Sequence, residues 1–191
     1  ALSQVFNFKS LLLHHNVLPP VLSTSENIVN IGNDSVIRVA DKMLTILLTP
    51  RFVTAAPTWQ HYMLMHFKAP ETPNTSLLPK TREETAIWNK YIVKSWHFGV
   101  EQANHIFNAN LARLKRDFNG MVLYRKLLAQ HMVTAPYVAE TTLGVTGNSQ
   151  SMRLNDRILR IASTANLITD TDSWDATLKH LKIDHPKEKH D

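Results

Sequence analysis

The longest regular pattern of apolar positions in the chain runs over residues 81–132. Apolar residues recur there mostly every three or four positions, which is the period of an α-helix, and no proline follows until Pro136. The phase of this stripe continues across Gly120, so the pattern predicts one helix rather than two. The residues on the stripe are Trp88, Ile92, Trp96, Gly99, Ala103, Ile106, Phe107, Leu111, Leu114, Phe118, Met121, Tyr124 and Leu128.

The start of this segment carries a helix-capping signal. In Thr81-Arg82-Glu83-Glu84, the Thr81 hydroxyl and the Glu84 carboxylate can each accept a hydrogen bond from an amide that the helix leaves unpaired. A helix of roughly 50 residues would span roughly 75 Å, and Gly120, about 1 kcal/mol less favourable than alanine there, is where a kink is expected. The rest of a small chain cannot cover such an element, so we expect part of it to contact another protein or another copy.

The chain before this helix alternates between short predicted elements. Residues 5–13 have the apolar content of a short helix that ends before Pro19 and Pro20. Two short strands are predicted at residues 27–31 and 36–39, joined by the turn sequence Gly32-Asn33-Asp34. A further extended region follows at 43–53, interrupted at Pro50, and a second short helix at 57–67. Residues 69–80 hold three prolines and predict a loop before the long helix.

Residues 137–162 carry the signal of a β-hairpin. Residues 137–146 alternate, Gly147-Asn148-Ser149-Gln150 is a turn sequence, and residues 152–162 form the return strand. The apolar phase of the return strand shifts near Asn155-Asp156, which predicts a bulge. A short helix is predicted at 170–181, and residues 184–191 are predicted to be a frayed tail.

Together these elements predict an α+β fold, predominantly helical, with one very long helix at about 81–132 and a small antiparallel β-sheet that includes the 137–162 hairpin. We predict a single α+β domain over residues 1–165, with the proline-rich loop 69–80 inside it. Residues 166–191 are predicted to form a short C-terminal helix and a tail.

Composition narrows the class of protein. Apolar residues make up 43% and charged residues 19%, which is typical of a folded globular chain. Cysteine is absent, which excludes disulfides, thiolate catalysis and cysteine-based zinc sites. There is no run of 18 apolar residues, so no transmembrane helix is predicted. Because the chain starts at Ala1 without an initiator methionine or a signal peptide, we expect it to have been processed or trimmed.

Residues able to do chemistry are few. His97, Glu101 and His105 are spaced four apart on one helix face, but no HExxH motif is present, and a polar flank is the simpler interpretation. His14 and His15 are adjacent, so they are poorly placed to share a metal, and a position at a helix end explains them better. With no nucleophile motif, Walker motif or dinucleotide-binding glycine pattern, we predict no catalytic, cofactor or metal residues and no enzymatic activity.

The net charge of +5 suits solubility, and also allows contact with an acidic partner. The basic residues of the long helix could contact nucleic acid, and a basic helical nucleic-acid-binding protein is the alternative function. They scatter around the helix and are interrupted by Asp117, which favours a solvated or salt-bridged face, so we expect no nucleic acid partner. These residues are Arg113, Lys115, Arg116, Arg125 and Lys126.

The stripe also supplies the candidate interface. Gly99 and Ala103 lie one turn apart and would let another backbone come close, while the large residues supply apolar area. The candidate interface residues are Trp88, Trp96, Gly99, Ala103, Phe107, Leu114, Phe118 and Tyr124.

Five segments of the sequence are long and unusual: LLLHHNVLPP at 11–20, PETPN at 70–74, GVEQAN at 99–104, NLARLKRDF at 110–118 and the segment 121–130. Together they resemble the DotC family. The resemblance covers roughly residues 6–162 and is a likeness of the whole segment, with no catalytic signature. Members of this family are components of type IVB (Dot/Icm) secretion systems, with counterparts in the transfer systems of IncI-type conjugative plasmids.

The resemblance implies a non-enzymatic outer-membrane lipoprotein that faces the periplasm. It implies DotD-like and DotH-like partners, a role in bringing the DotH-like protein to the outer membrane, and a place in a ring-shaped core complex. The lipid-bearing cysteine of such proteins is absent here, so the lipid anchor is expected outside this chain. Residues after 162 match nothing in the family, and the likeness covers effector secretion and conjugation equally.

Overall fold

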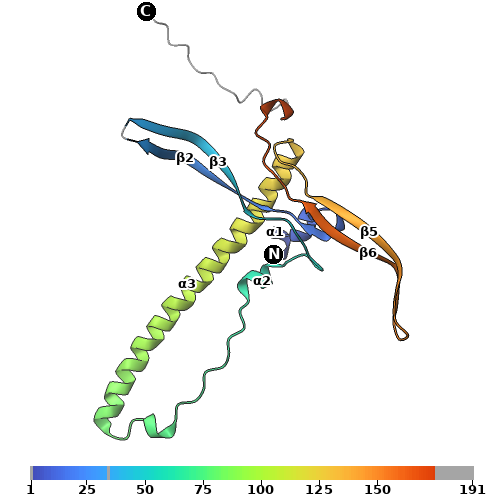
Figure 1. The fold of residues 1–191 in the computed structure, drawn as a ribbon. Coiled ribbons are helices and arrows are strands. Elements are labelled where there is room, and N and C mark those ends of the chain that lie inside the picture. Colours follow the sequence, from blue (N-terminus) through green and yellow to red (C-terminus); the bar gives the residue numbers. More distant parts are fainter. Residues whose placement is uncertain (1, 34, 175–191) are drawn as a thin grey trace, which may run out of the picture. The chain divides into compact units, whose positions relative to one another are not determined.

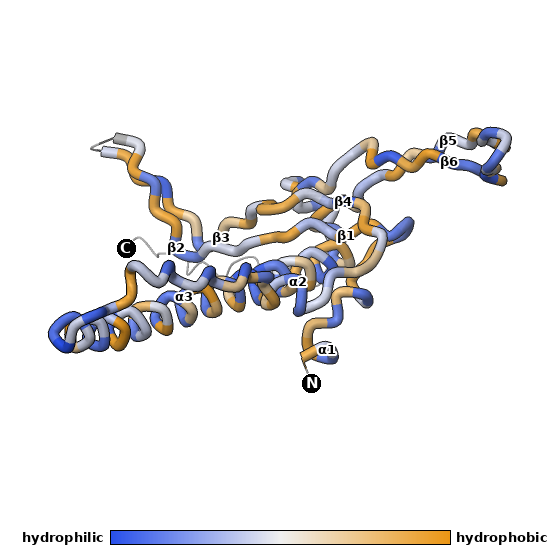
Figure 2. Tube along the Cα trace, turned by 90° about the horizontal axis from the view of Figure 1, so that it is seen from below, coloured by the Kyte–Doolittle hydropathy of each residue, from blue (hydrophilic) through white to orange (hydrophobic). Residues whose placement is uncertain are grey.

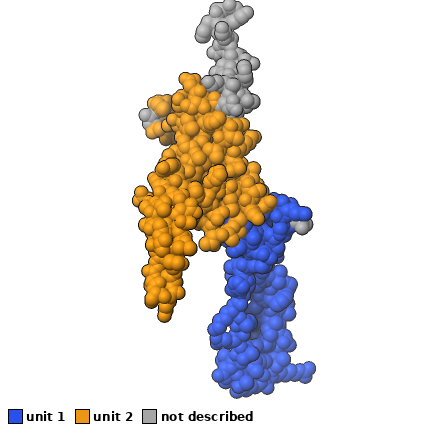
Figure 3. Space-filling model, turned by 90° about the vertical axis from the view of Figure 1, so that its right-hand side faces the viewer, with its two compact units in different colours: residues 1–6, 57–115 blue, residues 7–56, 116–191 orange. Residues whose placement is uncertain are grey.

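A computed structural model describes residues 2–33 and 35–174 of the chain. The chain forms two compact units, each built from two separate stretches of sequence (Figure 3). The first comprises Ala1–Phe6 and Pro57–Lys115, and the second comprises Asn7–Ala56 and the chain from Arg116 onward. The predicted division into residues 1–165 and 166–191 stays a prediction.

The long helix is present and continuous. Helix α3 runs over Arg82–Ala129, 48 residues, and its sequence passes from the first unit into the second (Figure 1). At 1.5 Å per residue it is about 72 Å long. Apolar and polar residues alternate around it, as the colouring in Figure 2 shows. The prediction of one helix across Gly120 is therefore confirmed.

Both ends of α3 are capped by hydrogen bonds. The Glu84 backbone N–H donates to the Thr81 hydroxyl (3.1 Å), and the Glu84 carboxylate accepts from the N–H groups of Lys80 (2.7 Å) and Thr81 (3.2 Å). Those two amides, Lys80 first, lower the pKa of Glu84 from its ordinary value. Because the folded pKa is lowered, this stabilisation of the helix start is present above the unfolded pKa and is lost as pH falls.

The far end of α3 is a Schellman motif with an unusual residue. The Met132 N–H donates to the Leu127 carbonyl (3.0 Å) and the His131 N–H donates to the Leu128 carbonyl (3.2 Å). His131 has φ 56°, in the left-handed region that this position requires and that glycine usually fills. The helix thus ends at Ala129, slightly before the predicted end.

The strands of the described residues all lie in the second unit and form three separate antiparallel pairs. Strand β1 (Val17–Leu18) pairs with β4 (Arg51–Phe52), β2 (Val21–Asn33) with β3 (Val36–Leu48), and β5 (Tyr137–Gly147) with β6 (Met152–Ser163) (Figure 1). The predicted α+β class is confirmed. The front strands and the 137–162 hairpin do not join one sheet, because each hairpin pairs only within itself among the described residues.

The second hairpin follows its sequence signals closely. The Asn148 side-chain oxygen accepts from the N–H groups of Gln150 (3.0 Å) and Ser151 (2.9 Å), which closes the predicted turn. The pairing shifts between Gly144↔Asp156 and Thr146↔Arg153. Two residues of β6 then oppose one of β5, and Asn155 has φ 54°. The predicted bulge is confirmed.

The core of the second unit packs the last turns of α3 against the first residues of β2. Phe8 meets Phe118 edge-to-face, with ring centroids 5.3 Å apart. One buried apolar cluster comprises Leu22, Tyr124, Leu127, Val133 and Ala165. Leu167 packs against this cluster, and the Ile168 N–H donates to the Met132 carbonyl (2.8 Å). The unit therefore closes around the end of the helix, where Tyr124 is fully buried.

Gly120 sets how closely the helix approaches β2. A Cβ added there would lie 2.5 Å from both the Leu22 carbonyl oxygen and the Val21 Cγ1. Real Cβ atoms do not come that close to a backbone atom, so only glycine allows this contact. The predicted weak point of the helix is therefore a close contact with β2, and the helix continues through it.

The first unit contains α1 (Leu2–Val5), α2 (Trp59–Met63) and the part of α3 up to Lys115. The Trp59 indole N–H donates to the Ser3 hydroxyl (3.1 Å), which joins α2 to α1. Residues 64–81 have no regular structure apart from a 3₁₀ turn at Thr75–Leu77. They return beside α3, where the Asn110 side-chain N–H donates to the Met65 sulfur (3.3 Å).

Two of the predicted helices are wrong in extent. The predicted helix at 5–13 is replaced by α1 and a 3₁₀ turn at Phe8–Leu11, because Asn7 caps a new turn by accepting from the Ser10 N–H. The predicted helix at 57–67 ends at Met63. Of the predicted helix at 170–181, residues 171–173 form a 3₁₀ turn and residues 175–181 lie outside the described residues, as does the predicted tail 184–191.

Gly120 and Gly99 offer a matched test of this packing. We expect Gly120→Ala to lower the free energy of unfolding by about 1–3 kcal/mol, because its Cβ overlaps backbone. Gly99→Ala should raise it by up to about 1 kcal/mol, because its Cβ would meet nothing within 4 Å and alanine favours helix. Urea unfolding followed by circular dichroism measures both, and an equal response of the two variants would contradict the close contact.

Tyr124 predicts a loss of stability in alkali. Burial raises its pKa to about 12, with Arg125 opposing the shift, and its hydroxyl donates to the Thr134 carbonyl (3.1 Å). Because the folded pKa is raised, this contribution is complete below the ordinary pKa of about 10 and is lost as pH rises through about 12.

The expected outcome is a difference between Tyr124→Phe and the native chain. At neutral pH the free energy of unfolding of Tyr124→Phe should be about 1 kcal/mol lower, because the hydrogen bond is absent. Between pH 10 and 12 its stability should decline less steeply than that of the native chain. Tyr91→Phe, at an exposed position, is the control. If all three proteins decline in parallel above pH 10, Tyr124 does not titrate as described.

Candidate interface on the long helix

The first unit carries an apolar groove along α3. Its volume is about 950 Å³, within the range of small-molecule and peptide sites. One residue, Pro70, comes from the returning loop, and the others follow the helical period. The groove is lined by Pro70, Trp88, Tyr91, Ile92, Ser95, Trp96, Gly99, Val100 and Ala103.

The helical repeat explains the shape of this groove. Residues spaced three and four apart lie on one face, and the groove residues recur at that spacing. Gly99 and Ala103 are small, so a partner can come close to the backbone there, while Trp88 and Trp96 supply large rings. The polar groups of the lining side chains are the hydroxyls of Ser95 and Tyr91 and the indole N–H groups of the two tryptophans, so the groove offers mainly apolar contact and no charged group.

The groove is open to solvent in this chain. Trp96 is 72% exposed, and Tyr91 and Ile92 are each at least half exposed. Beyond the groove, the same half of α3 exposes Val93, Phe98 and other large apolar side chains. Charged residues do little to cover them, apart from Lys94, whose Nζ lies 5.7 Å from the centroid of the Phe98 ring. A helix surface of this kind is an interaction surface by the criterion of exposed apolar area.

The eight candidate interface residues separate along the helix. Trp88, Trp96, Gly99 and Ala103 line the groove together. Phe107 is 55% exposed and lies outside the lining.

The remaining three candidate residues pack against other residues of the same chain. Leu114 and Tyr124 are buried, at 1% and 0% exposed, and Phe118 packs edge-to-face on Phe8. These three are therefore core residues in this structure. Helical periodicity gives the face of a residue and not what covers that face, and the candidate interface as a set stays a prediction.

The basic residues of α3 are not gathered into one surface. The Arg113 guanidinium carbon lies 5.4 Å from the centroid of the Tyr62 ring, and Arg116 donates two hydrogen bonds to the Asp117 carboxylate, at 2.9 and 2.7 Å. Asp117 is 5% exposed, so this ion pair is partly buried. Arg125 lines a separate pocket. The arrangement supplies no continuous basic stripe for a nucleic acid backbone.

Two further observations concern the described residues. No three His, Cys, Asp or Glu side chains in residues 2–33 and 35–174 lie close enough together to hold a metal ion, and this includes His97, Glu101 and His105. Within the same residues, every helix is either too short or too polar to pass through a bilayer.

Sequence reasoning missed two features. His14 and His15 do not end a helix, so the proposed interaction with a helix dipole is wrong; they form a 3₁₀ turn with Asn16 and line a pocket. The hairpin β2–β3 is much longer than predicted and exposes a second apolar surface. Its signal was present in the β-branched residues near the turn, such as Ile31 and Ile37, which pair across the strands.

Comparison with known proteins identifies a family for this chain. The model of a family described as "Type IV secretory system, conjugal DNA-protein transfer" matches residues 1–176. No curated protein matches the sequence. The family match covers both structural units, including the groove and the whole of α3. The chain therefore belongs to this family of type IV secretory system proteins for conjugal DNA-protein transfer.

Proposed function

We propose that this chain is a non-enzymatic structural subunit of a type IVB secretion or conjugation core complex, of the DotC kind. In this proposal it resides at the periplasmic face of the outer membrane, held by a lipid anchor outside the chain. It works with a DotD-like protein to place a DotH-like protein at that membrane, as part of a ring assembly.

The observation that carries the proposal is the exposed apolar groove on α3. A helix whose first half leaves Tyr91, Ile92 and Trp96 in water has lost the contacts that usually stabilise long helices in globular proteins. A neighbouring subunit that covers these residues would restore them. Trp and Tyr are the residue types that most often dominate the binding free energy of protein interfaces.

The hairpin β2–β3 supports the same interpretation independently. An isolated two-stranded hairpin is at best marginally stable in water, yet this one pairs over thirteen residues on each strand. Val29 pairs with Val39 and Ile31 with Ile37, and all four are more than half exposed. An unpaired strand edge beside an apolar face is a surface that another chain can cover.

The family and the sequence resemblance supply the setting. The family concerns type IV secretion and conjugal transfer. One of the sequence segments that resemble DotC, residues 99–104, lies at the end of the groove. Large envelope machines need subunits that contribute surfaces to a repeated assembly. This chain offers two such surfaces, one in each structural unit.

Photo-crosslinking from the groove tests the proposal. A photoreactive amino acid would replace Trp96 in the full-length protein, expressed in cells that carry the complete secretion or conjugation system. Glu101 is the matched control, because it is exposed and lies about 180° around the helix from Ile92 at 100° per residue. We expect crosslinks from position 96 to DotD-like or DotH-like outer-membrane proteins, and few from position 101.

A quantitative variant accompanies this experiment. We expect Trp96→Ser to weaken binding to that partner by about 2 kcal/mol, roughly thirtyfold. The free energy of unfolding should change by less than about 0.5 kcal/mol, because the side chain is exposed in the chain alone. Equal crosslinking from positions 96 and 101, or a full-length protein that fractionates away from the outer membrane, would contradict the proposal.

A further inference from the structure

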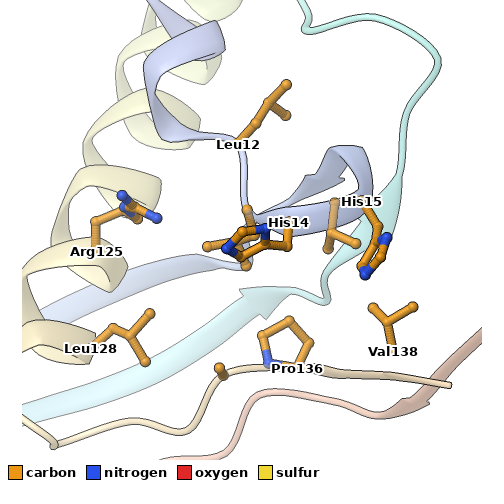
Figure 4. Close-up of a pocket in the computed structure, with 10 residues that line it drawn as sticks. Leu12, His14, His15, Arg125, Leu128, Pro136 and Val138 are labelled. Carbon is orange, nitrogen blue, oxygen red and sulfur yellow. The ribbon is translucent and has the colours of Figure 1, made fainter.

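A second pocket lies in the other structural unit, where residues before β1 approach the end of α3 and the start of β5. Its volume is about 670 Å³, enough for a small organic ligand. Figure 4 shows Arg125 and Leu128 extending from α3, with His14 and His15 from the segment before β1, and Pro136 and Val138 at the start of β5. The complete lining is Leu12, Leu13, His14, His15, Val17, Arg125, Leu128, Ala135, Pro136 and Val138.

The polar side chains of this pocket are all bases. Arg125 carries a permanent positive charge and can donate two parallel hydrogen bonds to a carboxylate or a phosphate. His14 and His15, with ring centroids 6.4 Å apart, each have a ring N–H to donate. In the close-up the His14 ring lies between Arg125 and His15 (Figure 4). No Asp or Glu occurs among the described residues that line the pocket, so the lining attracts an anion.

The backbone holds His15 and the next residue, Asn16, in an unfavourable conformation. His15 and Asn16 have φ 58° and 54°, in the left-handed region that residues with a Cβ rarely adopt. They are held there by hydrogen bonds on both sides, from the Leu13 N–H to the Val17 carbonyl (2.9 Å) and from the Val53 N–H to the Asn16 carbonyl (3.0 Å). Strain of this kind occurs often at binding sites. Here it occurs at His15, whose side chain lines the pocket beside that of His14.

The other seven lining residues are aliphatic or proline. Among the described residues of the lining there is no serine, threonine, asparagine or glutamine. A bound peptide would bring a backbone amide and carbonyl with every residue, and these side chains could satisfy few of them. A hydrocarbon chain needs no such partner. The lining therefore favours a ligand with one charged end and one apolar chain.

We propose that this pocket binds an anionic amphiphile, a carboxylate or phosphate group carried on a single hydrocarbon chain. Arg125, His14 and His15 bind the anionic head, and Leu12, Leu128 and Val138 contact the chain. The two sources of this chemistry are a free fatty acid and a lysophospholipid-like phosphate ester. The proposal does not depend on the interface on α3, which lies in the other structural unit.

Titration by NMR tests the proposal at the level of the site. The full chain, labelled with ¹⁵N, would be titrated below micelle concentration with decanoate, decyl phosphate, 1-decanol and inorganic phosphate. We expect decanoate or decyl phosphate to shift the resonances of His14 and Arg125 with saturation, and the stronger of the two identifies the head group. Decanol and inorganic phosphate, which each lack one half of the ligand, should bind at least about tenfold more weakly.

Substitutions provide the matched controls. Arg125→Gln should weaken binding about tenfold or more, whereas Lys126→Gln, its exposed neighbour outside the lining, should leave it unchanged. Val138→Glu should weaken it by placing a carboxylate in the pocket, and Val145→Glu, on the same strand at an exposed position, should not. Circular dichroism confirms that each variant is folded.

Three results would overturn the proposal. If decanol binds as tightly as decanoate or decyl phosphate, the charged head group has no role. If inorganic phosphate binds as tightly, the aliphatic lining residues have no role. Unchanged binding by both Arg125→Gln and Val138→Glu would place the ligand elsewhere. A short apolar peptide with a free carboxyl terminus that binds more tightly than either amphiphile would assign the pocket to a protein partner instead.

Discussion

The close contact at Gly120 is the constraint on which the rest of this structure depends. Because this residue has no side chain, the backbone of α3 can approach the backbone of β2 at Leu22. Around that point Tyr124 and Leu127 are buried with Leu22 in one cluster. The apolar stripe of the helix therefore has two roles. Its later residues form part of a core, and its earlier residues, from Trp88 to Ala103, line an open groove.

Secondary structure could be predicted from the sequence better than the burial of individual residues. Helical spacing, the capping box at Thr81 and Glu84, and the bulge near Asn155 are local signals, and each is present in the structure. The early helix failed because Asn7 competes for a local hydrogen bond and starts a new turn. What covers each residue depends on contacts distant in sequence. Leu114 and Trp96 lie on the same predicted stripe, yet one is buried and the other is largely exposed.

The two pockets divide the possible binding chemistry between the two structural units. The groove on α3 is apolar with one serine in its lining, and it suits an apolar protein surface. The pocket at His14 and Arg125 combines bases with an aliphatic wall, and it suits a small anionic ligand. Helical spacing predicted part of the groove, but the second pocket could not be predicted from spacing, because residues 12–17 are far in sequence from residues 125–138. Both surfaces lie within the residues that match the family of type IV secretory system proteins for conjugal DNA-protein transfer.

We propose that the first half of α3, which is exposed in the chain alone, is covered in the assembled machine. Hydroxyl-radical footprinting of Trp96 measures this directly, with the oxidation rate compared between the isolated chain and the assembly in native envelopes. We expect rapid oxidation of Trp96 in the isolated chain, where it is 72% exposed, and strong protection in the assembly. Equally rapid oxidation in both states would contradict it.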